Sequence, residues 1–240
     1  MQNKPFLTLS VLLACALTAC GGGGGGDGPS ASGPSTQVQG RWATAAGSTP
    51  AFTAIGMPAA NSSAAVWLLA NDASRLVRLT AQDSGTLAGK TYALGQNTAA
   101  AAVNGQWSTS ASTPKSLTLS GLPSGSLTLT QTDALTSAAV QTDAAGAWKA
   151  TVGGNAQSVS WAVTASGAVS GSSTTGCTYT GTLTAMTNAS AYTAAFRETC
   201  SDGASTLFNG IATLNSAKNA LSMVATGADE SVGVALFFAK

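Results

Sequence analysis

The chain has 240 residues, of which only 8% are charged; ten lysines and arginines against nine acidic residues give a formal net charge of +1. Apart from Lys4 the cations are scattered between Arg41 and Lys240, whereas a nucleic-acid-binding protein needs a basic face that reaches phosphates. The chain contains no histidine, which excludes serine–histidine and cysteine–histidine catalytic pairs and histidine-ligated metal sites.

The first twenty residues have the pattern of an export signal. Lys4 gives a positive start, and residues 6–16 are apolar over a length too short to span a bilayer. The next four residues, Leu17-Thr18-Ala19-Cys20, resemble the bacterial lipobox. The resemblance implies cleavage before Cys20, attachment of diacylglyceryl and palmitate chains to that cysteine and, because Gly21 follows, sorting to the outer membrane. The alternative is an ordinary signal peptide that happens to end in cysteine.

The sequence divides into four segments. Residues 1–19 are the predicted signal peptide, and residues 20–37 are the lipidated cysteine with a glycine, serine and proline tether that has too little apolar surface to fold. An N-terminal antiparallel β lobe is expected over residues 38–142 and a C-terminal β-barrel lobe over residues 143–240. Gly40-Arg41-Trp42 and Gly146-Ala147-Trp148 open segments of similar length, which predicts two lobes of similar plan.

Short segments bounded by turn residues predict an all-β N-terminal lobe. Pairing about Pro123 would place Leu119 opposite Leu127 and Leu117 opposite Leu129. Residues 133–145 lack a strand pattern and are expected to connect the lobes, with one helical turn. The predicted strands are residues 42–46, 51–55, 64–70, 76–81, 90–94, 105–110, 116–120 and 126–130.

The C-terminal lobe is predicted to form a small barrel. Val159, Trp161 and Val163 alternate with polar residues and should share the core face. About eight antiparallel strands in so short a segment favour a closed or nearly closed barrel. Besides the segments near Trp148 and Val169, the predicted strands are residues 158–164, 176–185, 192–200, 206–214, 220–226 and 232–239.

The cysteines predict one disulfide. Cys15 leaves with the signal and Cys20 carries lipid, so only Cys177 and Cys200 remain in the folded part of an exported protein, and such cysteines pair. The absence of histidine and of Cys-x-x-Cys spacing argues against a metal or redox pair.

The same hairpin has a predicted register. Folding about residues 187–190 places Gly181 opposite Phe196 and turns the alternate threonines of residues 178–184 to the outside. Glu198 then falls on the core face. Two interpretations remain for Glu198: a position at the barrel end near solvent or a cation, or a polar anchor inside a ligand cavity.

Three resemblances follow from these motifs. With Gly176-Cys177-Thr178-Tyr179, Asn209-Gly210-Ile211-Ala212 and Val234-Ala235-Leu236-Phe237-Phe238, the second lobe resembles a group of two-lobed β-rich proteobacterial lipoproteins that have no assigned activity. The plan of two lobes on a lipid tether is similar to surface lipoproteins of the transferrin-binding-protein B and factor H-binding type. The Gly-x-Trp at Trp42 and Trp148 resembles the opening motif of lipocalins, although a tryptophan that plugs the end of a β-core explains it as well.

The sequence predicts no catalytic, metal or cofactor site. Ser112-Thr113-Pro114-Lys115 matches Ser-x-x-Lys, but a proline interrupts it and a strand rather than a helix follows. We therefore expect a non-enzymatic, monomeric lipoprotein on the periplasmic or external face of the outer membrane. It would contact the membrane through its lipid anchor and act as a structural or binding module for an unidentified partner, such as another protein, without binding nucleic acid. The alternative is a lipocalin-like carrier of a small apolar ligand.

Overall fold

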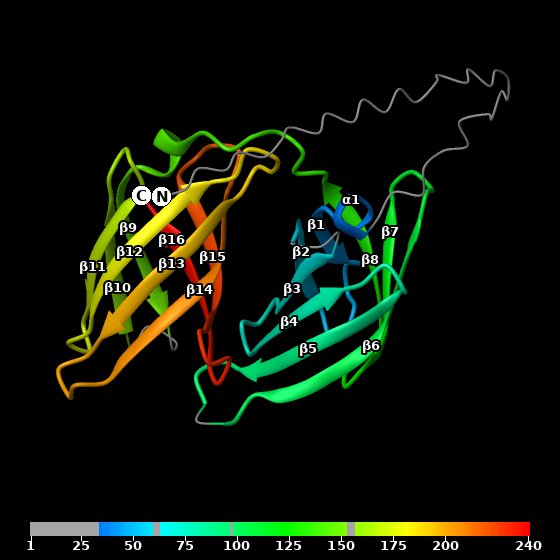
Figure 1. Ribbon diagram of the computed structural model, residues 1–240, viewed down its shortest axis with the longest axis horizontal. Helices are drawn as coiled ribbons and strands as arrows, with labels where there is room; N and C mark the ends of the chain where they lie inside the picture. Colours follow the sequence, from blue (N-terminus) through cyan, green and yellow to red (C-terminus); the bar gives the residue numbers. More distant parts are fainter. Residues whose placement is uncertain (1–33, 60–62, 97, 153–156) are drawn as a thin grey trace, which may run out of the picture. The chain divides into compact units, whose positions relative to one another are not determined.

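The computed structural model describes residues 34–59, 63–96, 98–152 and 157–240, all within one compact unit, Ser32–Lys240. The fold is all-β: within these residues, sixteen strands form two closed antiparallel barrels, β1 to β8 and β9 to β16, coloured blue to green and green to red in Figure 1. The predicted signal peptide and Cys20 lie outside the described residues. Within the described residues, no helix has both the length and the apolarity needed to cross a membrane.

The first barrel follows a single helical turn, α1, which the sequence analysis had included in the tether. Its eight strands are joined in chain order, and β8 returns to pair with β1. The elements are α1 (Pro34–Gln37), β1 (Gly40–Thr44), β2 (Phe52–Pro58), β3 (Ala64–Ala70), β4 (Arg75–Ala81), β5 (Thr86–Ala93), β6 (Ala101–Ser110), β7 (Ser116–Leu122) and β8 (Gly125–Asp133).

The second barrel follows the connector, in which the expected helical turn is the 3-10 helix η1. Here β9 closes the barrel by pairing with both β10 and β16. The elements are η1 (Gln141–Ala144), β9 (Gly146–Val152), β10 (Gln157–Val163), β11 (Ala168–Ser173), β12 (Thr178–Ala185), β13 (Tyr192–Thr199), β14 (Ser205–Leu214), β15 (Ala220–Gly227) and β16 (Gly233–Ala239).

The two barrels begin in the same way. The indole Nε1 of Trp42 donates a hydrogen bond to the carbonyl oxygen of Val38 at 2.9 Å, and that of Trp148 donates to Ala144 at 2.8 Å. Both indoles are buried and both acceptors belong to, or directly follow, a helical turn. The glycine two residues before each tryptophan has a positive φ, 141° at Gly40 and 137° at position 146, which side chains rarely adopt. The Gly-x-Trp repeat therefore anchors each barrel to the turn that precedes it.

Side chains fill the interiors of both barrels. Leucines and valines of the successive strands β3 to β8 form most of the first core, with Leu68, Leu117 and Leu129 fully buried. Aromatic rings dominate the second: the Trp161 ring centroid lies 4.7 Å from that of Phe238 and 5.0 Å from that of Phe196. Burial of this apolar surface supplies the main driving force for closing each sheet.

The predicted disulfide hairpin is confirmed. Cys177 and Cys200 are bonded, Gly181 lies opposite Phe196, and the outward threonines of β12 are exposed. The half-buried carboxylate of Glu198 accepts a hydrogen bond from the Tyr179 hydroxyl at 2.7 Å. Burial, followed by this contact with Glu198, raises the pKa of Tyr179 well above its ordinary value.

A third apolar cluster joins the two barrels. The first barrel contributes Ile55, Trp67 and Tyr92 from the outer face of its sheet, and the second contributes Ile211 and Val224. Because of this contact, β2, β3 and β15 are buried on both faces, unlike strands such as β12 that alternate between buried and exposed residues. The packing between barrels is what creates the candidate site.

Candidate functional site

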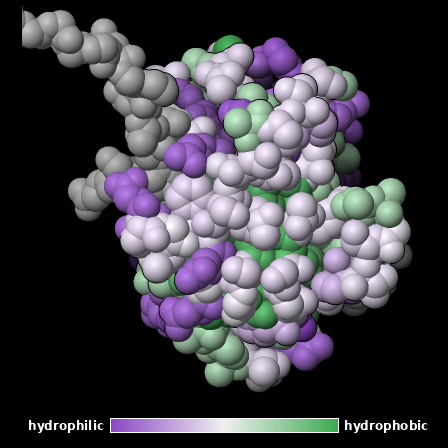
Figure 2. All heavy atoms as spheres, turned by 90° about the vertical axis from the view of Figure 1, so that its right-hand side faces the viewer, coloured by the Kyte–Doolittle hydropathy of each residue, from purple (hydrophilic) through white to green (hydrophobic). Residues whose placement is uncertain are grey.

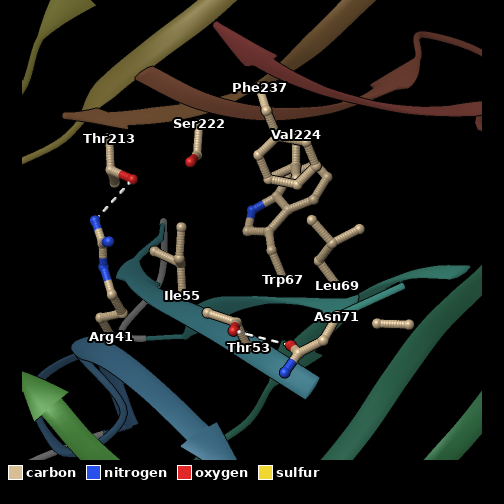
Figure 3. Close-up of a pocket in the computed structure, with 11 residues that line it drawn as sticks. Arg41, Thr53, Ile55, Trp67, Leu69, Asn71, Thr213, Ser222, Val224 and Phe237 are labelled. Carbon is tan, nitrogen blue, oxygen red and sulfur yellow. Dashed lines mark hydrogen bonds between the residues drawn. The ribbon is translucent and has the colours of Figure 1, made fainter. Parts of the chain in front are cut away.

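A cleft of about 310 Å³ opens beside this cluster, between the two barrels (Figure 3). Ile55, Trp67 and Leu69 of β2 and β3 form one wall. Val224 and Phe237 of β15 and β16 form the other, and Phe237 is 47% exposed. A large, half-exposed aromatic ring beside an open cleft is apolar surface available to a ligand.

On the first barrel, Arg41, Ile55 and Trp67 of the cleft belong to one row across the sheet. Arg41 pairs with Ile55, Ile55 with Trp67, Trp67 with Arg78 and Arg78 with Lys90 in the register of β1 to β5. Directly opposed residues share a face of the sheet, so the five side chains form a continuous outer row. The Arg78 guanidinium lies 5.3 Å from the Trp67 ring centroid, in cation–π contact. The row is thus an apolar centre flanked by cations.

On the second barrel, a row of two hydroxyl side chains and one aromatic ring faces the row of the first barrel. Thr213 of β14 lies opposite Ser222 of β15, which in turn lies opposite Phe237 of β16. Figure 3 places Thr213 and Ser222 facing Arg41 and Ile55, and Phe237 facing Trp67. Two hydroxyls therefore stand at the Arg41 end of the cleft and an aromatic ring at the other.

Arg41 bridges the two barrels without a carboxylate partner among the residues that the structure describes. Its Nη2 donates a hydrogen bond to the buried Thr213 Oγ1 at 3.0 Å, while its Nε is buried and has no hydrogen-bond partner. Within the described part of the chain, the ion pairs involve Arg78, Lys90 and Lys218 but not Arg41. A largely buried guanidinium with an unused donor is costly unless something neutralises it.

The other two cations of the row share one carboxylate from the second barrel. Glu230, in the turn between β15 and β16, lies 2.6 Å from Arg78 Nη1 and 3.4 Å from Lys90 Nζ. Docking of the barrels brings the two cations to Glu230, whose side chain stays 44% exposed. Asp229 accepts hydrogen bonds from the backbone and hydroxyl of Ser231, and these lower the pKa of its carboxyl group.

Trp67 adds a second unsatisfied donor to the cleft. Trp67 is only 5% exposed, and its Nε1 is buried without a hydrogen-bond partner. The indoles of Trp42, Trp107 and Trp148, in contrast, each donate to a backbone carbonyl. Buried N–H groups in folded proteins are nearly always paired, so an unpaired one that lines a cleft points to an external acceptor.

The disulfide region does not form a second site. The ligand atoms of Cys177, Glu198 and Cys200 lie within 4.8 Å of one another, as a metal site would require. Both sulfurs are consumed in the bond between them, however, and only thiolates bind metal ions strongly.

Figure 2 shows another face of the molecule, seen from the right-hand side of Figure 1. Most of it is pale, with apolar side chains visible near its centre and hydrophilic residues scattered around them.

No protein-family model matches the chain, and no curated protein or solved structure matches it either. Function must therefore be argued from the cleft itself. The sequence predicts no binding residues. Arg41 and Phe237 lie in segments that stand out for other reasons, namely the opening of the first lobe and the closing strand, and no motif marks Trp67.

Proposed function

We propose that the protein is a non-catalytic, lipid-anchored lipoprotein of the bacterial outer membrane that binds a ligand in the cleft between its barrels. The observation that carries this proposal is the pair of unsatisfied donors, Arg41 Nε and Trp67 Nε1, on a cleft walled by apolar side chains. A mostly apolar concavity with a few convergent polar groups is the usual form of a small-molecule site.

The lipid anchor is proposed from the lipobox resemblance at Leu17-Thr18-Ala19-Cys20. A glycine- and serine-rich segment separates Cys20 from the first described element, α1 at Pro34–Gln37. Such a composition gives a flexible tether. In this proposal the tether holds a monomeric pair of barrels close to the membrane, on its periplasmic or external side, while the cleft remains free to bind.

The carrier alternative would place the ligand inside a barrel. That arrangement needs interior space, and the centre of the second barrel is occupied by Trp161 packed against Phe196 and Phe238. The first barrel is filled by buried leucines and closed by Trp42. This packing favours the cleft over either interior as the place where a ligand binds.

The proposal is tested by photocrosslinking on intact cells. A photoreactive phenylalanine analogue replaces Phe237 in the full-length lipidated protein, and a matched protein carries the analogue at Leu207, which is 39% exposed on β14 but does not line the cleft. After irradiation, mass spectrometry measures the adducts on each labelled peptide. We expect a defined adduct at position 237 in clear excess over position 207. Equal labelling at the two positions would contradict the proposal.

A further inference from the structure

Resting on that proposed function, we infer that the cleft binds small amphiphiles that carry a carboxylate, with the carboxylate at Arg41 and the apolar part between Trp67 and Phe237. The three cations of the row differ in whether they have a negatively charged partner. Arg78 and Lys90 are neutralised by Glu230, whereas Arg41, among the described residues, hydrogen-bonds to the hydroxyl of Thr213 and forms no ion pair. An anionic group on a bound ligand would give Arg41 the negatively charged partner that Arg78 and Lys90 already have in Glu230.

The donors of the cleft select the chemistry of that group. The side chains of Arg41 and Trp67, which line the cleft, carry hydrogen-bond donors and no strong acceptor, so a polar ligand atom that contacts them must be an acceptor. The positive charge of Arg41 disfavours an ammonium group and favours a carboxylate, which also fits the planar guanidinium. Ser222 and Thr213, at the same end of the cleft, supply hydroxyls that can hydrogen-bond to it as well.

The walls of the cleft select the remainder of the ligand. Ile55, Leu69 and Val224 line its centre and the half-exposed Phe237 lines its far end. The surface beyond Arg41 is therefore mostly apolar, and its polar members, Thr53 and Asn71, hydrogen-bond to each other. Burying that surface beneath an alkyl or aryl group is favourable in proportion to the area removed from water. The volume of about 310 Å³ is at the small end for ligand pockets and suits a molecule with a short apolar chain.

The test compares three probes that share one alkyl chain: octanoate, 1-octanol and octylammonium. Calorimetric titration uses the chain from residue 20 onward with Cys20→Ser, which retains every described residue and avoids competition from attached lipid. We expect octanoate to bind at one site per chain, 1-octanol about tenfold to a hundredfold more weakly, and octylammonium not measurably, because a charge-assisted hydrogen bond has an effect of that size.

Variants then locate the carboxylate. Arg41→Gln should weaken octanoate about tenfold to a hundredfold and leave 1-octanol unchanged, whereas Arg41→Lys, which keeps the charge, should retain part of the affinity. Arg75→Gln, which removes the same charge from an exposed position of β4 outside the cleft, should leave octanoate binding unchanged. The comparison of probes on the unsubstituted protein remains decisive if an Arg41 variant folds poorly.

Two results would overturn the inference. Equal affinity for octanoate and 1-octanol, or equal effects of Arg41→Gln and Arg75→Gln, would show that the ligand carboxylate does not bind at Arg41. Absence of octanoate binding would exclude this ligand class, and the crosslinking comparison of positions 237 and 207 would then decide separately whether the cleft binds anything. If position 237 is crosslinked in excess of position 207 but octanoate does not bind, the proposed function stands and the carboxylate inference is rejected. If the excess crosslinking and the octanoate binding are both absent, the proposed function and the inference are both rejected.

Discussion

Gly181 offers the sharpest test of the second barrel's packing. It lies in β12 directly opposite Phe196 of β13. A Cβ atom added at Gly181 would collide with the carbonyl oxygen of Ala195 and would lie 2.5 Å from Cα and 2.6 Å from Cβ of Phe196. Since the first two of these neighbours are backbone atoms, relief requires β13 to move away rather than a side chain to rotate.

Gly181→Val should therefore destabilise the protein by about 1 to 3 kcal/mol, the usual range for overpacking a dense core. For a protein of this size that corresponds to a fall in Tm of roughly 2 to 12 °C. Differential scanning calorimetry measures the change directly. The neighbouring substitution Thr182→Val, on the exposed face of β12, should alter stability by no more than about 0.5 kcal/mol. Equal effects of the two substitutions would mean that the register and the packing around Phe196 have been misread.

Three further predictions concern the anchor, the tyrosines and the contact between barrels. Cys20→Ser should abolish both cleavage before residue 20 and incorporation of labelled palmitate, whereas processing at the same bond with membrane retention would refute lipidation there. Burial raises the pKa of Tyr92, Tyr179 and Tyr192, so the unfolded chain loses protons near pH 10 while the folded protein does not, and stability should fall as the pH rises above about 10. Ultraviolet titration should then show tyrosinate only as the protein unfolds; phenols that ionise near pH 10 in the intact fold would contradict this. Gly233→Val would place a Cβ 2.8 Å from Tyr92 Cγ on the other barrel, so it should lower the urea midpoint and reduce ligand affinity together, and a variant unchanged in both would disprove that close contact.

The hairpin could be predicted because its signals are local. Residues Thr178–Ala185 alternate with period two, the turn is short, and only two cysteines remain to pair. Closure of the first barrel had no such signal. It depends on β1 meeting β8, as in the pairing of Arg41 with Asp133, and those strands are separated by most of the lobe. The sequence analysis consequently predicted only an antiparallel lobe where the structure has a closed barrel.

The cleft could not be predicted from the sequence for a related reason, although the pattern of two strands gave one indication of it. Ala64–Ala70 and Ala220–Gly227 are apolar at nearly every position, and a strand of that kind is covered on both faces. Their turn-bounded patterns predict ordinary barrel strands with one exposed face, but the outer faces of both strands are buried where the barrels meet. Even with that clue, nothing local links Arg78 to Glu230, because their contact exists only after the barrels dock.

The indole N–H signals of the five tryptophans can show whether a ligand binds in the cleft between the barrels. Trp42, Trp107 and Trp148 donate to carbonyls, whereas the indole nitrogens of Trp67 in the cleft and Trp161 inside the second barrel have no hydrogen-bond partner. In a two-dimensional NMR titration with octanoate, with the Trp67 signal assigned through Trp67→Phe, we expect the Trp67 indole peak to move and saturate while that of Trp161 stays in place. Movement of the Trp161 peak with the Trp67 peak unchanged would mean that the ligand binds inside the second barrel and not in the cleft.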